Sequence, residues 1–250
     1  MANSDEIPIA DALRRVEERI AAACATAGRD PSEVGIVGVS KKFGPEIVAE
    51  AWEAGIHIFG ENRLQEAAYK IPQCLSGPEW HFIGHLQRNK VRHVLALFTT
   101  IHAVDSQRLL EQIEADAQAA GVMPNILLEV NVSGESSKFG LKPQEVPLLV
   151  RDALCCKNTT LIGLMTMAPF HPEPEQTRPV FSKLRELRQQ LEQQFSISLP
   201  HLSMGMSNDY EIAVAEGATM VRLGTTLFGG RPTMKDTLRQ QLSNGGIWEE

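Results

Sequence analysis

Val34-Gly35-Ile36-Val37-Gly38-Val39-Ser40 is a short apolar run that ends at Lys41 and is soon followed by the breaker pair Gly44-Pro45. A continuous apolar run of this length, bounded by breakers, is typical of a strand buried on both faces of a parallel sheet. A lysine held partly desolvated at the end of such a strand can lose its proton and attack a carbonyl. The ordinary alternative for Lys41 is an exposed loop lysine.

The same alternation of strand and helix repeats along the chain. We expect strands at Val34–Ser40, Ile56–Gly60, Trp80–Gly84, Thr100–Asp105, Ile126–Val132, Leu161–Met167, His201–Met204 and Thr219–Gly224. Helical patterns fill most gaps, at about 45–54, 62–71, 87–97, 106–120, 143–156, 173–194 and 208–216. Eight strands with seven intervening helices predict an α/β fold, a single TIM-like (β/α)8 barrel. A doubly wound open sheet is the alternative.

An extra helix precedes the first strand. The stretch 7–27 carries apolar residues at helical spacing and predicts an amphipathic N-terminal helix. The length of 250 residues fits one barrel, and no linker rich in Pro, Gly and Ser marks a second domain. We therefore expect one domain over residues 1–231 and a surface tail over residues 232–250.

Composition excludes several classes of function. The formal net charge of -7 argues against nonspecific nucleic-acid binding, because few cations are available to neutralise phosphates. The N-terminus lacks the features of a signal peptide, and no apolar run reaches the ~18 residues of a membrane span. The four cysteines form no C-x-x-C pair, which fits free thiols in a reducing compartment. We expect a cytoplasmic protein without membrane or nucleic-acid partners.

Residues that can carry chemistry recur where the expected strands end. In chain order they are Lys41, Glu61-Asn62, His85, Asp105, Asn131 with Ser133, Met165-Thr166-Met167, Ser207-Asn208-Asp209, and Arg222 with Gly224-Thr225. Each is a weak signal alone. In a barrel, however, the carboxyl ends of all strands meet at one face, where active sites of this fold lie.

The loops after the seventh and eighth strands predict a phosphate site. Ser207 or Asn208 is expected to be the N-cap of a helix beginning near Asp209, and a helix N-terminus favours an anion. Gly224-Thr225 would allow close backbone approach and add a hydroxyl. These two loops hold a phosphate in many barrels. A pure helix cap at Ser207 and a simple tight turn at Gly224 remain the alternatives.

A lysine on the first strand beside a phosphate site on the last two is what pyridoxal 5'-phosphate (PLP) requires, because it needs an amine for its aldehyde and an anion site. It also needs a partner for its ring nitrogen. Arg222 lies two residues before Gly224, so both face the same side of their strand.

Other chemistries have less support in the sequence. No nucleotide-binding glycine loop and no G-x-S-x-G elbow occur. His81 and His85 are four apart, but Gly84 is expected to end a strand between them, so the helical facing of a metal pair does not apply. We expect no metal site.

The assembled motifs closely resemble the pyridoxal phosphate homeostasis protein family. The match runs from about residue 10 to 231. Its motifs are Val39–Lys41, Phe59–Asn62, His81–Lys90, Gly163–Met167, and Ser203–Asp209 continuing to Val221–Thr225.

This resemblance implies a barrel like the N-terminal domain of alanine racemase, with PLP as cofactor. It implies a Schiff base at Lys41 and Arg222 directed toward the pyridine nitrogen. It further implies phosphate contacts from Ser207, Gly224 and Thr225, with Asn62 as a pocket residue.

Two features of the sequence distinguish a PLP carrier from a PLP-dependent enzyme. A cation at the ring nitrogen disfavours ring protonation and makes a poorer electron sink. The racemases that the chain resembles add a tyrosine from a further β-domain and the partner subunit, whereas both tyrosines here, Tyr69 and Tyr210, fall in helical patterns. We therefore expect a non-catalytic protein that buffers or delivers PLP, a monomer, and transient contact with PLP-dependent apo-enzymes. The alternatives are a small fold-type-III racemase or decarboxylase, and a phosphosugar barrel enzyme in which Lys41 forms a substrate imine.

Overall fold

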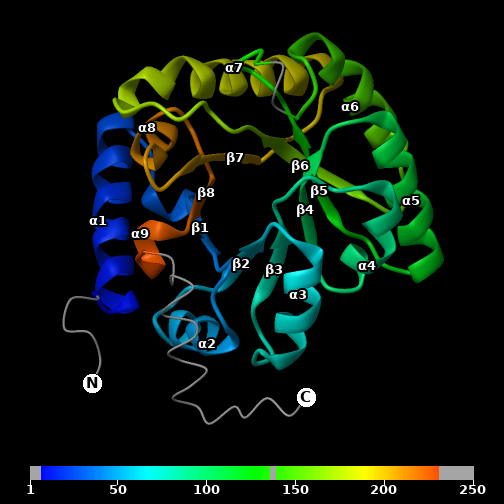
Figure 1. The fold of residues 1–250 in the computed structure, drawn as a ribbon. Coiled ribbons are helices and arrows are strands. Elements are labelled where there is room, and N and C mark those ends of the chain that lie inside the picture. Colours follow the sequence, from blue (N-terminus) through cyan, green and yellow to red (C-terminus); the bar gives the residue numbers. More distant parts are fainter. Residues whose placement is uncertain (1–6, 136–138, 231–250) are drawn as a thin grey trace, which may run out of the picture.

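Eight parallel strands close into a barrel in the computed structural model, which describes residues 7–135 and 139–230 (Figure 1). Each strand pairs in parallel with its successor, and the last pairs with the first. The strands are β1 (Gly35–Val39), β2 (Ile58–Glu61), β3 (Glu79–Phe82), β4 (Thr100–Val104), β5 (Asn125–Glu129), β6 (Thr160–Met165), β7 (His201–Met206) and β8 (Met220–Leu223). The predicted barrel is therefore confirmed, and the open-sheet alternative is wrong.

Helices form a ring around the barrel (Figure 1). They are α1 (Ile9–Ala27), α2 (Pro45–Glu53), α3 (Leu64–Lys70), α4 (Val91–Leu95), α5 (Gln107–Ala120), α6 (Val146–Leu154), α7 (Arg178–Phe195), α8 (Tyr210–Ala215) and α9 (Thr225–Phe228). Several are shorter than their apolar patterns suggested, because single 3-10 turns at Arg88–Lys90, Pro143–Glu145 and Pro174–Thr177 occupy their first residues. The short helix α9 was not predicted. The predicted tail, residues 232–250, lies outside the described residues.

The extra helix α1 covers one side of the barrel. It lies against α8 and α9, which are only 6 and 4 residues long (Figure 1). Its buried stripe includes Leu13, Val16 and Ile20. Burial of this stripe extends the hydrophobic core outward over α8 and α9.

No helix in the described part of the chain is long and apolar enough to cross a bilayer. All four cysteines are free thiols, as predicted.

Candidate functional site

A cavity of about 570 Å³ lies at the carboxyl ends of the strands. All six residues proposed from the sequence line it, namely Lys41, Asn62, Ser207, Arg222, Gly224 and Thr225. The wall also includes apolar side chains, among them Val39, Ile83 and Phe170. The volume lies within the range of roughly 300–1,000 Å³ usual for small-molecule sites. Barrel closure thus gathers residues that are up to 184 positions apart, from 41 to 225.

Lys41 occupies a tight turn directly after β1. The Phe43 N–H donates to the Ser40 carbonyl over 3.0 Å, and Lys42 adopts a left-handed conformation with φ of 70°. The turn directs Lys41 into the cavity wall while Lys42 is exposed. Side-chain alternation along an extended segment would also separate the two lysines, but the segment is a turn and not extended.

A buried ion pair between Lys70 and Glu61 holds this turn in place. Lys70 Nζ, at the end of α3, donates to the Ser40 carbonyl and to Glu61 Oε1, both over 2.7 Å. The Ser40 hydroxyl donates to the same carboxylate oxygen over 2.7 Å. Glu66, four residues before Lys70, accepts the N–H of Lys42. Both residues that flank Lys41 are therefore held by one cluster of charges.

This cluster was missed in the sequence. The Lys70 and Glu61 side chains are only 4% and 0% exposed. Burial raises the pKa of Glu61, while the charge of Lys70 and the hydrogen bonds oppose that rise. The available signal was the i,i+4 spacing of Glu66 and Lys70, which is common on exposed helices and so does not indicate burial.

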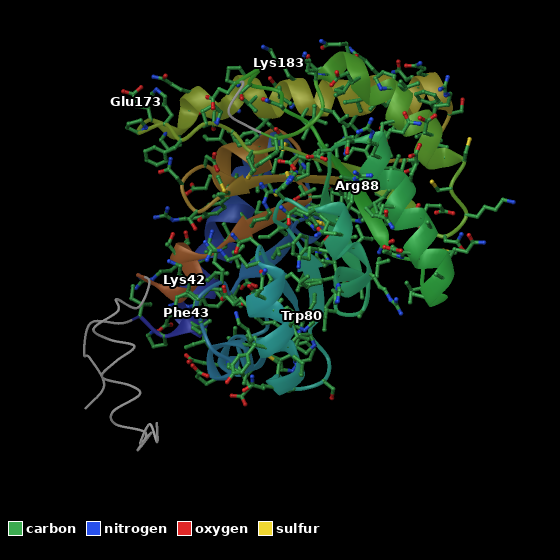
Figure 2. All side chains as sticks on the ribbon, turned by 45° about the vertical axis from the view of Figure 1, so that its right-hand side comes forward. Lys42, Phe43, Trp80, Arg88, Glu173 and Lys183 are labelled. Atoms are coloured by element: carbon green, nitrogen blue, oxygen red, sulfur yellow. The ribbon has the colours of Figure 1, made fainter. Side chains whose placement is uncertain are left out.

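The loops after β7 and β8 are joined to each other and to the Lys41 turn. The N–H of Thr226 donates to Ser207 Oγ over 3.3 Å. Phe228 of α9 packs against Phe43 with ring centroids 5.5 Å apart. Figure 2 shows Lys42 and Phe43 beside this short helix. Three loops that are distant in sequence therefore form one wall.

The predicted N-cap at Ser207 or Asn208 is wrong. Helix α8 begins at Tyr210, and its N-cap is Asp209, whose carboxylate accepts the N–H of Met206 over 2.7 Å. The chain turns sharply before it, at Gly205 with φ of 90°, where a Cβ would lie 2.6 Å from that of Ala213. This turn leaves the Ser207 side chain at the cavity wall, bonded to the next loop, instead of capping its own helix.

Arg222 is buried inside the barrel and held from two sides. Its Nη1 donates to Ser203 Oγ over 2.6 Å, and its Nη2 donates to the Thr166 carbonyl over 3.0 Å. The guanidinium can only donate, so the Ser203 hydroxyl accepts it and has its own hydrogen left for another partner.

That partner is His102, the start of a chain of histidines along the barrel. Ser203 Oγ lies 2.8 Å from His102 Nδ1, and His102 Nε2 lies 2.9 Å from His81 Nδ1. His81 Nε2 lies 3.0 Å from the Glu79 carboxylate. Because Arg222 donates to Ser203, the Ser203 hydroxyl donates to His102 Nδ1, so His102 is neutral and carries its hydrogen on Nε2, which faces His81. Burial lowers the pKa of His102 well below its ordinary value, and a proton on His81 or the charge of Arg222 lowers it further.

Glu129 is a cavity residue that the sequence analysis did not single out. Burial raises its pKa to about 7, as does repulsion from Asp105, against the opposing charge of Arg222. Burial also lowers the pKa of Arg222 to about 10, opposed by Glu129 and Asp209. An acidic residue within the apolar stretch Asn125–Val130 was the available signal for Glu129.

His85, in the loop after β3, contacts Asp105 and Phe139 at the cavity. His85 Nδ1 lies 3.4 Å from an Asp105 oxygen, and its ring stacks on Phe139 with centroids 3.9 Å apart. Both rings line the cavity. In residues 7–135 and 139–230, no group of three or more His, Cys, Asp or Glu side chains could hold a metal ion.

The chemistry of the cavity wall fits PLP. The wall carries a lysine amine from Lys41, a buried guanidinium from Arg222, and the hydroxyls of Ser207 and Thr225. The N–H of Thr225, the first residue of α9, has no acceptor within its own helix. Amine, cation and phosphate-binding donors are the three groups that this cofactor needs.

A closed barrel with a lysine after its first strand defines the class of alanine racemase-like barrels. The family model for the alanine racemase N-terminal domain matches residues 12–232. Alanine racemase from Clostridium difficile 630 has the same fold, with a TM-score of 0.70 at 15% identity over 90% of this chain and 58% of that one.

Within this class, the chain belongs to the family of pyridoxal phosphate homeostasis proteins. The pyridoxal phosphate homeostasis protein of Aquifex aeolicus is 44% identical over 88% of this chain and 96% of the relative, and that of Bos taurus is 38% identical over 94% and 91%. PipY of Synechococcus elongatus PCC7942, solved with PLP bound, gives a TM-score of 0.75 at 35% identity and covers 86% of this chain and all of that one.

Proposed function

We propose that this protein binds PLP in the cavity at the carboxyl ends of the strands and buffers or delivers it within the cell. The observation that carries the proposal is the convergence of Lys41, Arg222 and Ser207 on one cavity of about 570 Å³. Relatives named for PLP homeostasis and the PLP-bound PipY support the choice of ligand. Residues 1–231 would act as one cofactor-binding unit.

Each residue of the wall has a distinct role in this proposal. When bound, the cofactor supplies an aldehyde that an amine attacks reversibly, and Lys41 would provide that amine. Arg222 would face the pyridine nitrogen, because its hydrogen bonds fix a cation deep in the cavity. Ser207, Gly224 and Thr225 would hold the phosphate, and Asn62 would complete the wall.

We propose that binding occurs without efficient catalysis. A guanidinium opposite the ring nitrogen disfavours its protonation and so weakens the cofactor as an electron sink. Tyr69 is 75% exposed on α3 and Tyr210 is buried in α8. Neither belongs to the described wall of the cavity, so neither is placed to supply general acid–base help, which is worth ~10²–10⁴-fold.

One observation favours the alternative of a small PLP-dependent racemase or decarboxylase. Glu129 lines the cavity with a pKa of about 7, which suits a group that exchanges protons at neutral pH. Turnover of alanine or serine by the cofactor-loaded protein, lost in Glu129→Gln while PLP stays bound, would establish this alternative. We expect no such turnover above the rate of free PLP.

The decisive experiment maps the attachment of PLP. Borohydride reduction of the loaded protein should fix a pyridoxyl group on Lys41, identified by peptide mass spectrometry. Lys41→Ala should abolish the adduct and the imine absorbance. Lys42→Ala is the matched control, because Lys42 is adjacent but exposed, and it should retain both. An adduct that maps to another lysine in the unaltered protein would refute the assigned site.

Three expectations stay predictions: a monomeric state, transient contact with apo-enzymes and a cytoplasmic location.

A further inference from the structure

A second cavity lies at the opposite end of the barrel. Its volume is about 390 Å³, and its wall includes Arg29, Arg185, Arg188, His201 and Thr219. His201 begins β7 and Thr219 directly precedes β8, so the cavity lies at the amino ends of the strands. It shares no lining residue with the cavity proposed to bind PLP.

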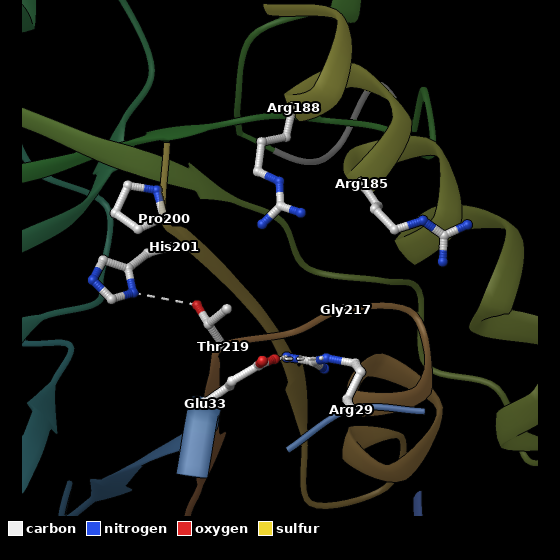
Figure 3. A pocket seen from close by; sticks show the side chains of 8 residues that line it. All are labelled: Arg29, Glu33, Arg185, Arg188, Pro200, His201, Gly217 and Thr219. Carbon is white, nitrogen blue, oxygen red and sulfur yellow. Dashed lines mark hydrogen bonds and ion pairs between the residues drawn. The ribbon is translucent and has the colours of Figure 1, made fainter. Parts of the chain in front are cut away.

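Arg188 extends from α7 toward the middle of this cavity (Figure 3). Its Nε is buried and has no hydrogen-bond partner among the described residues. The nearest carboxylate oxygen, from Glu192, lies 3.9 Å from it, beyond hydrogen-bond distance. A buried donor without an acceptor costs free energy, so an acceptor that enters the cavity would be bound favourably.

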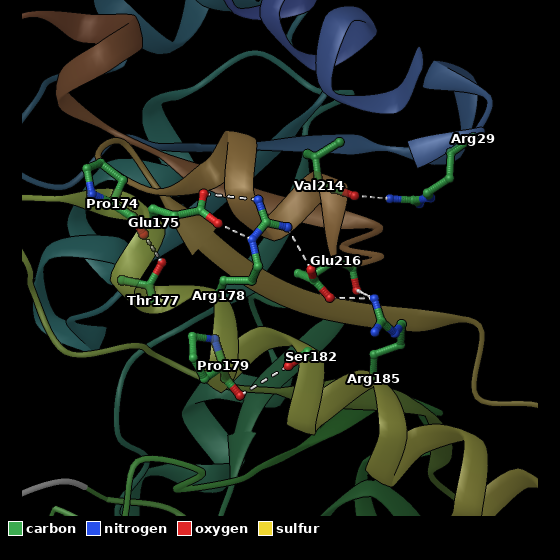
Figure 4. A network of polar contacts seen from close by, with 10 residues as sticks. All are labelled: Arg29, Pro174, Glu175, Thr177, Arg178, Pro179, Ser182, Arg185, Val214 and Glu216. Carbon is green, nitrogen blue, oxygen red and sulfur yellow. Dashed lines mark hydrogen bonds and ion pairs between the residues drawn. The ribbon is translucent and has the colours of Figure 1, made fainter. Parts of the chain in front are cut away.

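Two further arginines border the same space. Arg29 donates to the Val214 carbonyl over 2.6 Å and pairs with Glu33, whose side chain is 54% exposed. Arg185 bonds through Nη1 to Glu216. Glu216 is shared, because its other oxygen accepts from Arg178 over 2.7 Å (Figure 4). Glu33 is therefore exposed, and Glu216 is shared between two arginines. The guanidiniums of Arg29 and Arg185 keep N–H groups available.

The remaining wall can also take part in binding. His201 Nδ1 lies 3.3 Å from the Thr219 hydroxyl, on the side of the cavity across from Arg185 (Figure 3). Burial lowers the pKa of His201, and a proton on His81 would lower it further, so the ring adds no charge at neutral pH. The positive groups of the wall are thus the three arginines: Arg185 and Arg188 from α7, and Arg29 from the segment that follows α1.

We propose that this cavity binds a small phosphate-bearing anion through Arg188, with Arg185 and Arg29 at its sides. A planar carboxylate offers two oxygens and fills one guanidinium fork, whereas a tetrahedral phosphate can accept from several forks at once. Free phosphate and the phosphate of a small monoester share this chemistry. The volume leaves room for the organic group of a monoester.

The test follows His201 by NMR while inorganic phosphate is added to the PLP-loaded protein, so that the other phosphate site is filled. We expect a saturable shift of the imidazole resonances that sodium chloride at equal ionic strength does not reproduce. Glycerol phosphate in place of phosphate distinguishes the sources: tighter binding identifies a monoester, and equal or weaker binding identifies free phosphate. His201 lines this cavity and not the cavity proposed to bind PLP. The readout is therefore valid even if PLP does not bind at the other end.

Arg188→Gln should weaken phosphate binding at least about tenfold, the loss expected for a hydrogen bond to a charged group. Lys183→Gln is the matched control, because it removes the same charge from an exposed position of α7 and should leave the affinity unchanged (Figure 2). Without phosphate, Arg188→Gln should unfold about as easily as the unaltered protein, since Nε makes no hydrogen bond among the described residues and its ion pair with Glu192 is long, at 3.9 Å.

No saturable shift of His201, or equal affinity in Arg188→Gln, would overturn the proposal. A purely structural Arg188 would instead show lower stability of the variant in phosphate-free buffer.

Discussion

Glu129 is a buried residue whose ionisation affects stability. It is 3% exposed and lies at the carboxyl end of β5, and its pKa is raised from 4.5 to about 7. Between these two values the folded protein holds a proton that the unfolded chain has released. Stability therefore falls as the pH rises from below 4.5 through 7, and the loss persists above 7.

Glu129→Gln should remove this dependence. Relative to the variant, the unaltered cofactor-free protein should lose up to about 3 kcal/mol of unfolding free energy over that window, at about 1.4 kcal/mol for each pKa unit. Urea unfolding at a series of pH values measures the difference. Glu53→Gln, an exposed position on α2, should keep the pH dependence of the unaltered protein. Parallel curves for the protein and Glu129→Gln would contradict the raised pKa.

Lys70 is predicted to position Lys41 without touching the cofactor. Lys70→Met leaves Glu61 buried and unpaired, which should cost about 3–5 kcal/mol of stability. Adding Glu61→Gln should recover much of that loss, because no charge then remains buried. The Ser40 carbonyl would still lack the hydrogen bond from Lys70, so the double variant should release PLP faster than the unaltered protein. Urea unfolding and dialysis of bound PLP separate the two effects; normal PLP retention in the double variant would assign Lys70 to stability alone.

At the scale of elements, α1 packs over the short helices α8 and α9 and joins them to the core. Ile20 is 3% exposed in the stripe that faces the barrel. Ile20→Ala should therefore lower the unfolding free energy by about 2–5 kcal/mol, the cost of a large-to-small change in a core. Arg15→Ala, on the exposed face of α1, is the control and should change it by less than about 0.5 kcal/mol. A small effect of Ile20→Ala would show that α1 is dispensable for the barrel.

The ends of elements were harder to predict than their order. The apolar spacing placed all eight strands and the N-terminal helix, because the periods of strand and helix are local properties of the chain. The predicted cap of α8 was wrong because the chain turns at Gly205, where the close approach to Ala213 depends on how α8 packs back against β7. Helix α9 was missed because its 4 residues are too few for a periodic signal.

For the whole molecule, we predict a monomer. The fold match spans 58% of the alanine racemase chain from Clostridium difficile. Light scattering coupled to size exclusion should give the mass of one chain, at both low and high protein concentration. A mass of two chains that persists on dilution would disprove the monomer.

The sequence by itself determined the barrel, its N-terminal helix and the six residues from Lys41 to Thr225 that line one cavity. These follow from local periodicity, from the rule that parallel strands end at one face, and from motifs that resemble a known family. Only the tertiary structure revealed Lys70 beneath the Lys41 turn, the histidine chain behind Arg222, Glu129 in the wall and the arginine cavity at the far end. Each depends on side chains that meet across the barrel, and burial then changes their charge and hydrogen bonding. A linear pattern does not encode which distant residues come into contact.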